Sequence, residues 1–284
     1  MTHLVFATCL STLMVIHSRR KKSLSVDGAM AAFMLGLVTF SSDLWLFTVV
    51  LLTFFLSSSK LTKFKASRKR VLEAEYELSS ERNWVQVACN GLAGGIAVAL
   101  FQVLCQDQSY ACYDQARWST LLLWAYIGHY GCCAGDTWAS ELGILNKDWP
   151  ILITRFKKVP PGTNGGVSGL GLAASLAGGA FVGLAGTLTL YFEQPCHGFA
   201  WELIVLGSLA GVGGSLVDSL LGATVQQSLY SEDQKKIVPE LKPGENIKII
   251  SGVPILDNHQ VNILSSFITT CVCALAALYL YPTA

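Results

Sequence analysis

The stretch LLLWAYIGHYGCCAGDTWASELG (residues 121–143) joins a run of apolar residues to two acids, Asp136 and Glu141. Its first part is apolar enough to lie in lipid. The whole chain shares this character, because 52% of its 284 residues are hydrophobic and only 14% are charged. Soluble domains carry about 25% charged residues, so the composition predicts a polytopic integral membrane protein. A net charge of +1, with no basic stripe interleaved with aromatic residues, excludes nucleic acid as a partner.

Apolar segments recur along the chain, and a helix needs about 20 residues to span a bilayer. We count eight candidate segments, which would form one integral membrane domain over residues 1–284. The sequence therefore predicts an all-α, polytopic bundle of membrane helices. The second and third segments are short and, in the alternative, form a re-entrant hairpin. The segments are 2–17, 28–41, 44–57, 85–104, 118–134, 167–192, 200–225 and 261–281.

The lysines and arginines predict the topology of these segments. All of the 20 basic residues except Arg117 lie in four stretches between segments, namely 19–22, 60–82, 147–158 and 235–248. Loops that carry such an excess of Lys and Arg face the cytoplasm. We therefore expect a cytoplasmic connector helix at 58–84, a cytoplasmic glycine-rich loop at 144–166 and a cytoplasmic loop at 226–258. Both termini would lie on the opposite side, in an internal membrane such as the endoplasmic reticulum.

The nine cysteines form no CxxC pair, and we interpret most of them as buried thiols. Cys105, Cys112 and Cys196 fall on the side predicted to be opposite to the cytoplasm. An oxidising compartment would allow a disulfide bond among them.

Two segments carry small residues at every fourth position. The first stripe is Gly171, Ser175, Gly179 and Gly183, and the second is Gly207, Gly211, Ser215 and Ser219. Such stripes allow helix backbones to approach closely in lipid. We therefore expect the segments 167–192 and 200–225 to pack against each other.

Three acids lie at the cytoplasmic ends of apolar segments. An ionised carboxylate at the position of Asp218 costs on the order of 3 kcal/mol unless it faces a polar cavity or an ion. The alternative for Asp218 and Asp136 is hydration at the membrane interface, and Glu141 is equally consistent with an ordinary surface residue. Asp136 and Glu141 are five residues apart and share no helical face, so they would act together only if the helix breaks at Gly135.

The loop KKVPPGTNGGVSGLG (157–171) has the composition of an anion-binding site. Its glycines allow backbone amides to approach a phosphate, and a helix that starts near Val167 adds a positive dipole. Asn164 and Ser168 add donors, while Lys157 and Lys158 bring positive charge. The alternative is a flexible hinge between two helices. Two carboxylates from different helices would suit Mg²⁺, which is held by one or two carboxylates together with water and substrate phosphates.

Six motifs resemble the transmembrane protein 19 family, which includes the plant phytyl-phosphate kinase. They are KKSLSVDGAMAAF (21–33), RNWVQVACNG (82–91), GDTWASELG (135–143), VPPGTNGGVSGLG (159–171), SLVDSLLGATVQ (215–226) and HQVNILSS (259–266). A Gly-Asp at a helix end followed by a basic, glycine-rich loop is more distantly similar to CTP-using lipid kinases and CDP-diacylglycerol synthases.

The resemblance implies a Mg²⁺-dependent kinase that transfers a phosphoryl group from CTP, or another nucleoside triphosphate, to an isoprenoid monophosphate in the membrane. Asp136 and Asp218 would bind Mg²⁺, and Glu141 would be a further catalytic ligand. The residues that would hold nucleotide and acceptor phosphates are Lys157, Lys158, Thr163, Asn164, Gly165, Gly166, Ser168, Asn90 and Asn262. The lipid acceptor and the nucleotide donor are left open by the sequence.

Two other classes of function compete with the kinase. In an ion-coupled transporter of a small anionic or lipid substrate, the same two aspartates would bind the coupling ion, and polar groups would collect near the midplane of the bilayer. Here they collect toward one face, which favours an active site. The third alternative is a membrane protein without catalytic activity.

Overall fold

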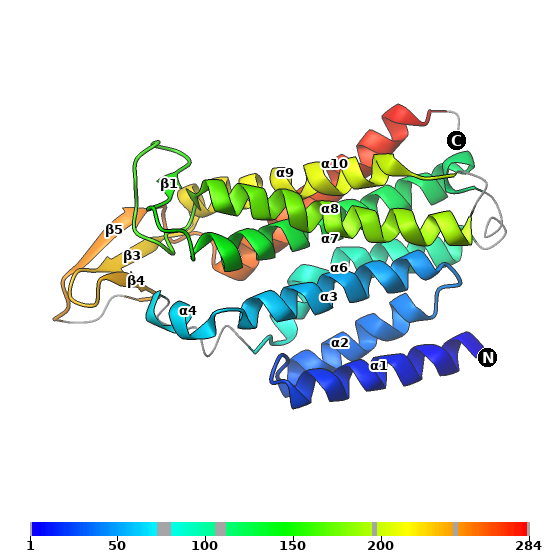
Figure 1. The fold of residues 1–284 in the computed structure, drawn as a ribbon, viewed down its shortest axis with the longest axis horizontal. Coiled ribbons are helices and arrows are strands. Elements are labelled where there is room, and N and C mark those ends of the chain that lie inside the picture. The colour runs from blue at the N-terminus through cyan, green and yellow to red at the C-terminus, as the bar shows by residue number, and fades with distance from the viewer. Residues whose placement is uncertain (1, 73–80, 106–111, 195–197, 241–243, 283–284) are drawn as a thin grey trace.

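The computed structural model describes residues 2–72, 81–105, 112–194, 198–240 and 244–282 (Figure 1). In these ranges the chain forms long helices that run side by side, together with short strands at one end of the bundle. The helices are α1 (Thr2–Arg20), α2 (Val26–Phe40), α3 (Trp45–Lys63), α4 (Ala66–Leu72), α6 (Trp84–Leu104), α7 (Arg117–Gly143), α8 (Gly169–Glu193), α9 (Trp201–Val225) and α10 (Asn258–Leu280).

The helices have the length and composition of membrane spans. Five of those in the described ranges, α3, α6, α8, α9 and α10, are long and apolar enough to cross a bilayer. Helix α2 is apolar but has only 15 residues. The chain is thus a mostly helical integral membrane protein, as the composition predicts. The count of eight crossings and the re-entrant hairpin stay predictions, although α3 is longer than expected and ends at Lys63.

Helix α7 is the centre of the bundle. It packs against α3, α6, α8, α9 and α10, and nearly all of its residues from Ser119 to Gly135 are buried. The Tyr126 hydroxyl donates a hydrogen bond of 2.6 Å to the backbone oxygen of Phe47 on α3. A helix that is covered by protein on every side needs no lipid-compatible surface. This explains how α7 can carry polar side chains through the middle of the molecule.

Glycine contacts hold α7, α8 and α9 together. A Cβ atom built on Gly179 of α8 would lie 2.0 Å from the Gly207 oxygen of α9, and one on Gly211 would lie 2.5 Å from the Ser175 oxygen. The predicted packing of the two stripes is therefore confirmed. Helix α7 joins the same contact, since a Cβ on Gly135 would lie 2.5 Å from the Gly211 Cα.

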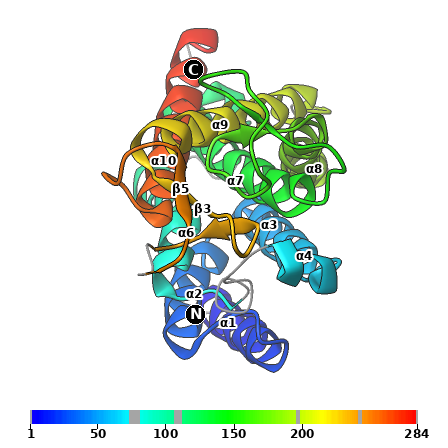
Figure 2. The same ribbon diagram turned by 90° about the vertical axis from the view of Figure 1, so that its left-hand side faces the viewer.

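Short strands close one end of the bundle. Strands β1 (Ile151–Leu152) and β2 (Gly166–Val167) form an antiparallel pair, with Ile151 opposite Val167. The second sheet has the order β4-β3-β5 and consists of β3 (Ser228–Ser231), β4 (Lys236–Val238) and β5 (Ile247–Ser251). The two segments expected to be loops, 144–166 and 226–258, thus contain strands. An end-on view shows the second sheet beside the helix ends, with α1 and α2 on one side of the bundle (Figure 2).

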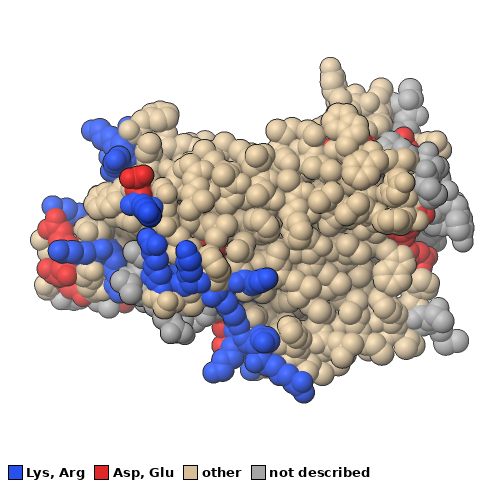
Figure 3. Space-filling model, in the orientation of Figure 1, with Lys and Arg blue, Asp and Glu red and all other residues tan. Residues whose placement is uncertain are grey.

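Charged side chains mark this same end of the molecule. Lysines and arginines gather over the ends of α1, α3 and α4 and around the strands, whereas the helical surface between the two ends is largely uncharged (Figure 3). Helix α1 begins and helix α10 ends at the opposite end, on different sides of the molecule (Figure 1). The strand-bearing end is therefore the basic end, in agreement with the charge pattern of the sequence.

Part of two sequence predictions falls outside the described ranges. The connector helix predicted at 58–84 is interrupted after Lys63 and continues as α4, while its residues 73–80, with Glu73, Glu75 and Glu77, lie outside the description. Of the three cysteines considered for a disulfide, Cys112 is disulfide-bonded and Cys105 is a buried free thiol. Cys196 lies outside the described ranges.

Candidate functional site

Two carboxylates from different helices line one cavity at the basic end of the bundle. Asp136 comes from α7 and Asp218 from α9, and both border a cavity of about 330 Å³. The close contact between Gly135 and Gly211 brings the two helix backbones together beside this position. Both side chains are part-exposed toward the cavity. The structure thus brings together the two aspartates that the sequence singled out as metal ligands.

Neutral donors hold the two carboxylates. Ser265 of α10 donates a hydrogen bond of 3.1 Å to Asp218 Oδ2, and the amide nitrogen of Asn262, oriented toward the acceptors around it, lies 3.0 Å from the same oxygen. The hydroxyl of Ser215 hydrogen-bonds to Asp136. No lysine, arginine or histidine in the described part of the chain forms an ion pair with either aspartate. The two carboxylates therefore border the cavity without an ion-pair partner among the described residues.

The Asp136 and Asp218 carboxylates suit a hard divalent cation whose other coordination positions are open to water and substrate. The described residues contain no cluster of three or more His, Cys, Asp or Glu side chains that would form a closed metal cage. Mg²⁺ is commonly held by one or two carboxylates, with water and substrate phosphates in its other positions. Asp136 and Asp218 are the residues that would hold such an ion, with Ser215, Asn262 and Ser265 orienting them.

The glycine-rich loop forms the wall opposite the aspartates. Residues 161–168 line the cavity, and the β1–β2 pair holds the two ends of the loop together. Gly165 has a φ of +78°, and a Cβ there would lie 2.4 Å from the Ala223 Cβ of α9, so the position requires glycine. The Asn164 amide donates to Ser228 Oγ at 3.0 Å, which ties the loop to β3.

The loop uses part of its hydrogen-bonding capacity internally. The Thr163 hydroxyl is buried and donates to the Pro160 oxygen at 2.7 Å, while the Gly166 amide donates to the Thr163 oxygen at 2.9 Å. Ser168 caps α8 by accepting a hydrogen bond of 3.0 Å from the Gly171 amide. In this structure, hydrogen bonds at several positions therefore hold the loop in place as a wall of the cavity. Its role in binding phosphate stays a prediction.

A second, larger cavity adjoins the first. It has a volume of about 920 Å³ and is lined by residues from α6, α7, the second sheet and the start of α10. Asn90 of α6 and Glu141 of α7 border it. The two cavities share Asp136, Ser140, Gly162, Asn164, Gln226, Asn258 and Asn262. Pockets for small molecules commonly have volumes of about 300–1,000 Å³. The two cavities together are therefore large enough for a small-molecule ligand.

Two predicted phosphate ligands lie away from the cavities. Lys157 and Lys158 are exposed on the far side of the loop, where the Leu152 amide donates to the Lys157 oxygen at 2.9 Å. Neither lysine lines one of the two cavities. The sequence suggested them because they immediately precede the glycines, but the chain turns between these positions. Their contact with a phosphate stays a prediction.

Glu141 has a partner that the sequence did not suggest. It forms an ion pair with Lys69 of α4, whose side chain is fully buried and also donates to the Leu61 oxygen at 2.8 Å. The break at Gly135 that would have let Glu141 act together with Asp136 does not occur, because α7 runs without interruption to Gly143. Glycine at position 135 serves the packing against α9. Glu141 thus anchors α4 at the rim of the larger cavity.

We expect Glu141→Gln to destabilise the protein by roughly 3–5 kcal/mol, because it leaves the Lys69 charge buried without its partner. Thermal unfolding of the purified protein in detergent measures this. The double variant Lys69→Met/Glu141→Gln should recover part of the loss. A Glu141→Gln protein that is as stable as the wild type would favour a direct role for Glu141 in binding a metal instead.

His129 is a hydrogen-bonded interior residue. It is fully buried, with Nε2 at 3.1 Å from the Asn90 oxygen and Nδ1 at 3.3 Å from Thr270 Oγ1. These contacts give His129 a structural role in the interior of the bundle. The Asn90 side chain donates a hydrogen bond of 2.9 Å to the Gln86 oxygen, one turn earlier in α6.

The fold and the site define a multi-pass membrane protein with an acidic, loop-covered cavity at its basic end. The chain matches the family model of the integral membrane protein DUF92 over residues 9–270, and it belongs to this family. Protein PGR of Arabidopsis thaliana is 42% identical over 98% of this chain and 97% of its own length. An uncharacterized membrane protein of Methanocaldococcus jannaschii is 26% identical over 78% of this chain and 82% of its own length.

A third relative is more distant and matches a smaller part of the chain. Protein VTE6, chloroplastic, of Arabidopsis thaliana is 25% identical over 72% of this chain and 56% of its own length. These matches confirm the membrane family that the sequence motifs predict. No solved structure matches the chain.

Proposed function

We propose that the protein is a membrane kinase that transfers a phosphoryl group from a nucleoside triphosphate, with CTP as the first candidate, to an isoprenoid monophosphate. The observation that carries the proposal is the pairing of Asp136 and Asp218 in one polar cavity, opposite an ordered glycine-rich wall. The family resemblance drawn from the motifs gives the substrate class. The distant similarity to Protein VTE6, chloroplastic, is consistent with this proposal.

Phosphoryl transfer suits this site because the reaction depends on positioning and on neutralising charge more than on covalent catalysis. Mg²⁺ held by Asp136 and Asp218 would neutralise the phosphates of the donor. An oxygen of the acceptor monophosphate attacks the γ-phosphorus, the bond from that phosphorus to the bridging oxygen breaks, and the nucleoside diphosphate leaves. The acceptor oxygen is already ionised at neutral pH, so the protein needs no strong general base.

The proposal includes a topology in which eight helices cross the membrane and the strand-bearing end faces the cytoplasm, where nucleotides are available. The gathering of basic residues at that end supports it, as does the position of the start of α1 and the end of α10 at the other end. We expect a glycosylation acceptor tag fused after Pro282 to be modified in microsomes, and the same tag inserted between Asp233 and Gln234 to stay unmodified. The reverse pattern would place the cavity on the wrong side for a cytoplasmic nucleotide.

Metal dependence tests the chemistry of the aspartate pair. Removing divalent cations with EDTA should abolish transfer, and adding Mg²⁺ should restore it. Transfer that continues unchanged in EDTA would contradict the assignment of Asp136 and Asp218 as ligands. Uptake of an anionic substrate into vesicles, with no transfer from any triphosphate, would instead favour the transporter.

A further inference from the structure

A third cavity lies in the apolar part of the bundle and shares three lining residues with the larger polar cavity. It lies among α1, α2, α3 and the start of α6, and its volume is about 70 Å³. Leu35 of α2 and Leu52 and Phe55 of α3 are among the apolar side chains that line it. All three are part-exposed, so the cavity opens toward the surface that lipid would cover. Its mostly apolar lining suits part of a flexible hydrocarbon chain better than a sugar or a base.

Three polar residues form the boundary between the polar and the apolar cavity. Arg82, Gln86 and Asn90 line both of them. A positive charge thus lies where an apolar cleft meets a polar chamber. The linings change from apolar to cationic to polar along this path. This order complements an amphiphile that has a hydrocarbon chain and an anionic head group.

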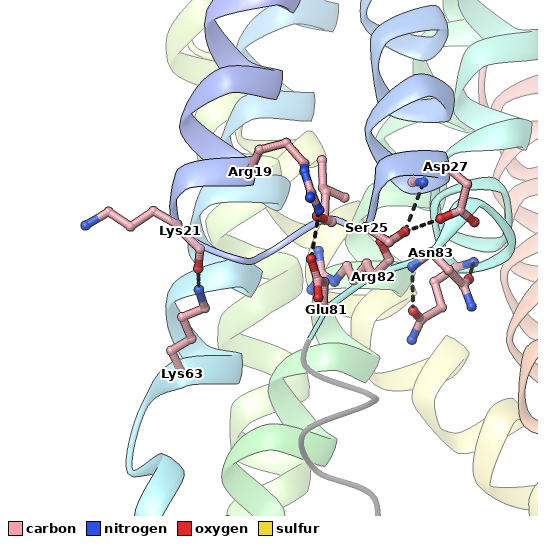
Figure 4. A network of polar contacts seen from close by, with 11 residues as sticks. Arg19, Lys21, Ser25, Asp27, Lys63, Glu81, Arg82 and Asn83 are labelled. Atoms are coloured by element: carbon pink, nitrogen blue, oxygen red, sulfur yellow. Dashed lines mark hydrogen bonds and ion pairs between the residues drawn. The ribbon is translucent and has the colours of Figure 1, made fainter.

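The backbone of Arg82 is fixed by the connection between α1 and α2. Its amide donates to the Ser23 oxygen at 3.1 Å, and its oxygen accepts from the Ser25 amide at 3.0 Å and from Ser25 Oγ at 3.2 Å. A Cβ on Gly28 would lie 2.2 Å from the Arg82 oxygen, so glycine is required for this approach. Figure 4 shows these contacts around Arg82.

Neighbouring residues strengthen the same anchor. The Glu81 carboxylate accepts from Arg19 Nη1 at 2.8 Å, and the Trp84 amide donates to Asp27 Oδ2 at 3.1 Å. Asn83 and Gln86 form a reciprocal capping box at the start of α6 (Figure 4). The residues on both sides of Arg82 are therefore held to α1 and α2, which fixes the arginine at the junction of the cavities.

The environment of the Arg82 guanidinium favours a bound anion. Burial lowers the pKa of Arg82 below its usual value, and the neighbouring Glu141 carboxylate acts in the opposite direction. The group stays charged at neutral pH. Arg82 is part-exposed at the edge of both cavities. An arginine that is partly shielded from water binds a phosphate more strongly than a fully exposed one does, and its planar group can donate two parallel hydrogen bonds.

We infer that Arg82 binds the phosphate of the lipid acceptor, whose hydrocarbon chain lies in the cleft formed by α1, α2, α3 and α6. This inference rests on the proposed function for the identity of the lipid, and it names the acceptor site of that reaction. The acceptor phosphate would enter the larger cavity from the Arg82 side and meet the donor at the Asp136 side. Gln86 and Asn90 supply further polar contacts along the way.

Photo-crosslinking without any nucleotide tests the acceptor site. The probe is farnesyl monophosphate with a diazirine at the far end of its chain, added to the purified protein in lipid nanodiscs. We expect the label on residues of α1, α2 or α3 that line the cleft. Unlabelled farnesyl monophosphate should compete with it, and farnesol should compete at least tenfold less well because it lacks the phosphate.

Matched variants separate binding from folding. Arg82→Gln should weaken binding of the probe about tenfold or more and Arg82→Lys less, whereas Arg155→Gln, a loss of charge at an exposed position outside the cavities, should leave it unchanged. Ala32→Phe fills the cleft and should reduce labelling. Met30→Phe changes the same helix at a side chain that is 67% exposed and should not.

The outcomes distinguish this inference from the proposed function. Label in the cleft without transfer from any triphosphate would retain the lipid phosphate site and reject the kinase. Transfer with label outside the cleft, and with the acceptor KM unchanged in Arg82→Gln and Ala32→Phe, would overturn the acceptor site and retain the kinase. If Arg82→Gln fails to fold, labelling of Ala32→Phe at the wild-type level would still overturn it.

Discussion

Asp136→Asn and Asp218→Asn should each lower phosphoryl transfer by roughly 100-fold or more, because each removes one carboxylate of the α7–α9 pair that lines the smaller cavity. Asparagine keeps the size of the side chain and most of its hydrogen bonds, so the protein should still fold. The measurement is the initial rate of transfer at a Mg²⁺ concentration that saturates the wild type, beside the elution profile in detergent. A partial return of activity at higher Mg²⁺ concentration would locate the defect in metal binding.

The control for these variants is Asp43→Asn. Asp43 lies in the connection between α2 and α3 at the opposite end of the bundle, where it pairs with His3 on an exposed surface. We expect its activity to equal that of the wild type. Wild-type activity in both Asp136→Asn and Asp218→Asn would contradict the site, because no other pair of carboxylates lines the smaller cavity in a comparable position among the described residues.

Gly179→Leu should prevent or strongly weaken folding. Even a Cβ at this position would lie 2.0 Å from the Gly207 oxygen, which is part of the backbone of α9 and cannot move aside alone. Overpacking of this kind costs roughly 3 kcal/mol or more. The measurement is thermal unfolding in detergent together with the yield of monodisperse protein.

Gly213→Leu is the matched control on α9. A Cβ at Gly213 would meet no atom within 4 Å, and the position is exposed on the helix surface. A leucine there faces lipid and also replaces a residue that disfavours helix, so stability should be unchanged or higher. Equal destabilisation by both substitutions would mean that the close contact between α8 and α9 is not what holds the bundle together.

The features that sequence could predict are those set by local pattern. Apolar segments, the four-residue spacing of small residues and the loops rich in lysine and arginine predicted the helices, the contact between α8 and α9, and the basic end. Asp136 and Asp218 could be singled out because a carboxylate next to an apolar run is costly in lipid. Each of these inferences uses the physical chemistry of a single segment and its surroundings.

The features that sequence could not predict depend on contacts between distant segments. Lys69 and Glu141 are 72 positions apart, and nothing in either segment shows that the lysine is buried. In the sequence, Arg82 is one of several basic residues in the stretch 60–82, and only the fold places it beside two cavities. Asn262 and Ser265 of α10 donate hydrogen bonds to Asp218. The sequence indicates only that these two residues share a helical face, because they are three positions apart.

The boundaries of α7 show how tertiary structure can override composition. The helix was expected to end near residue 134, because polar residues follow, and it runs to Gly143. Surrounding helices, the glycine-rich loop and Lys69 supply the polar environment that lipid would not. The continuous helix directs Asp136 and Glu141 toward different partners, which separates a site residue from a structural one.

The most direct test of the proposed kinase is transfer of labelled phosphate from γ-labelled CTP, ATP, GTP or UTP to a panel of isoprenoid monophosphates by the purified wild-type protein with Mg²⁺. The account predicts a labelled isoprenoid diphosphate and an unlabelled nucleoside diphosphate in equal amounts. Folded protein that forms no diphosphate with any donor and acceptor in the panel would contradict it.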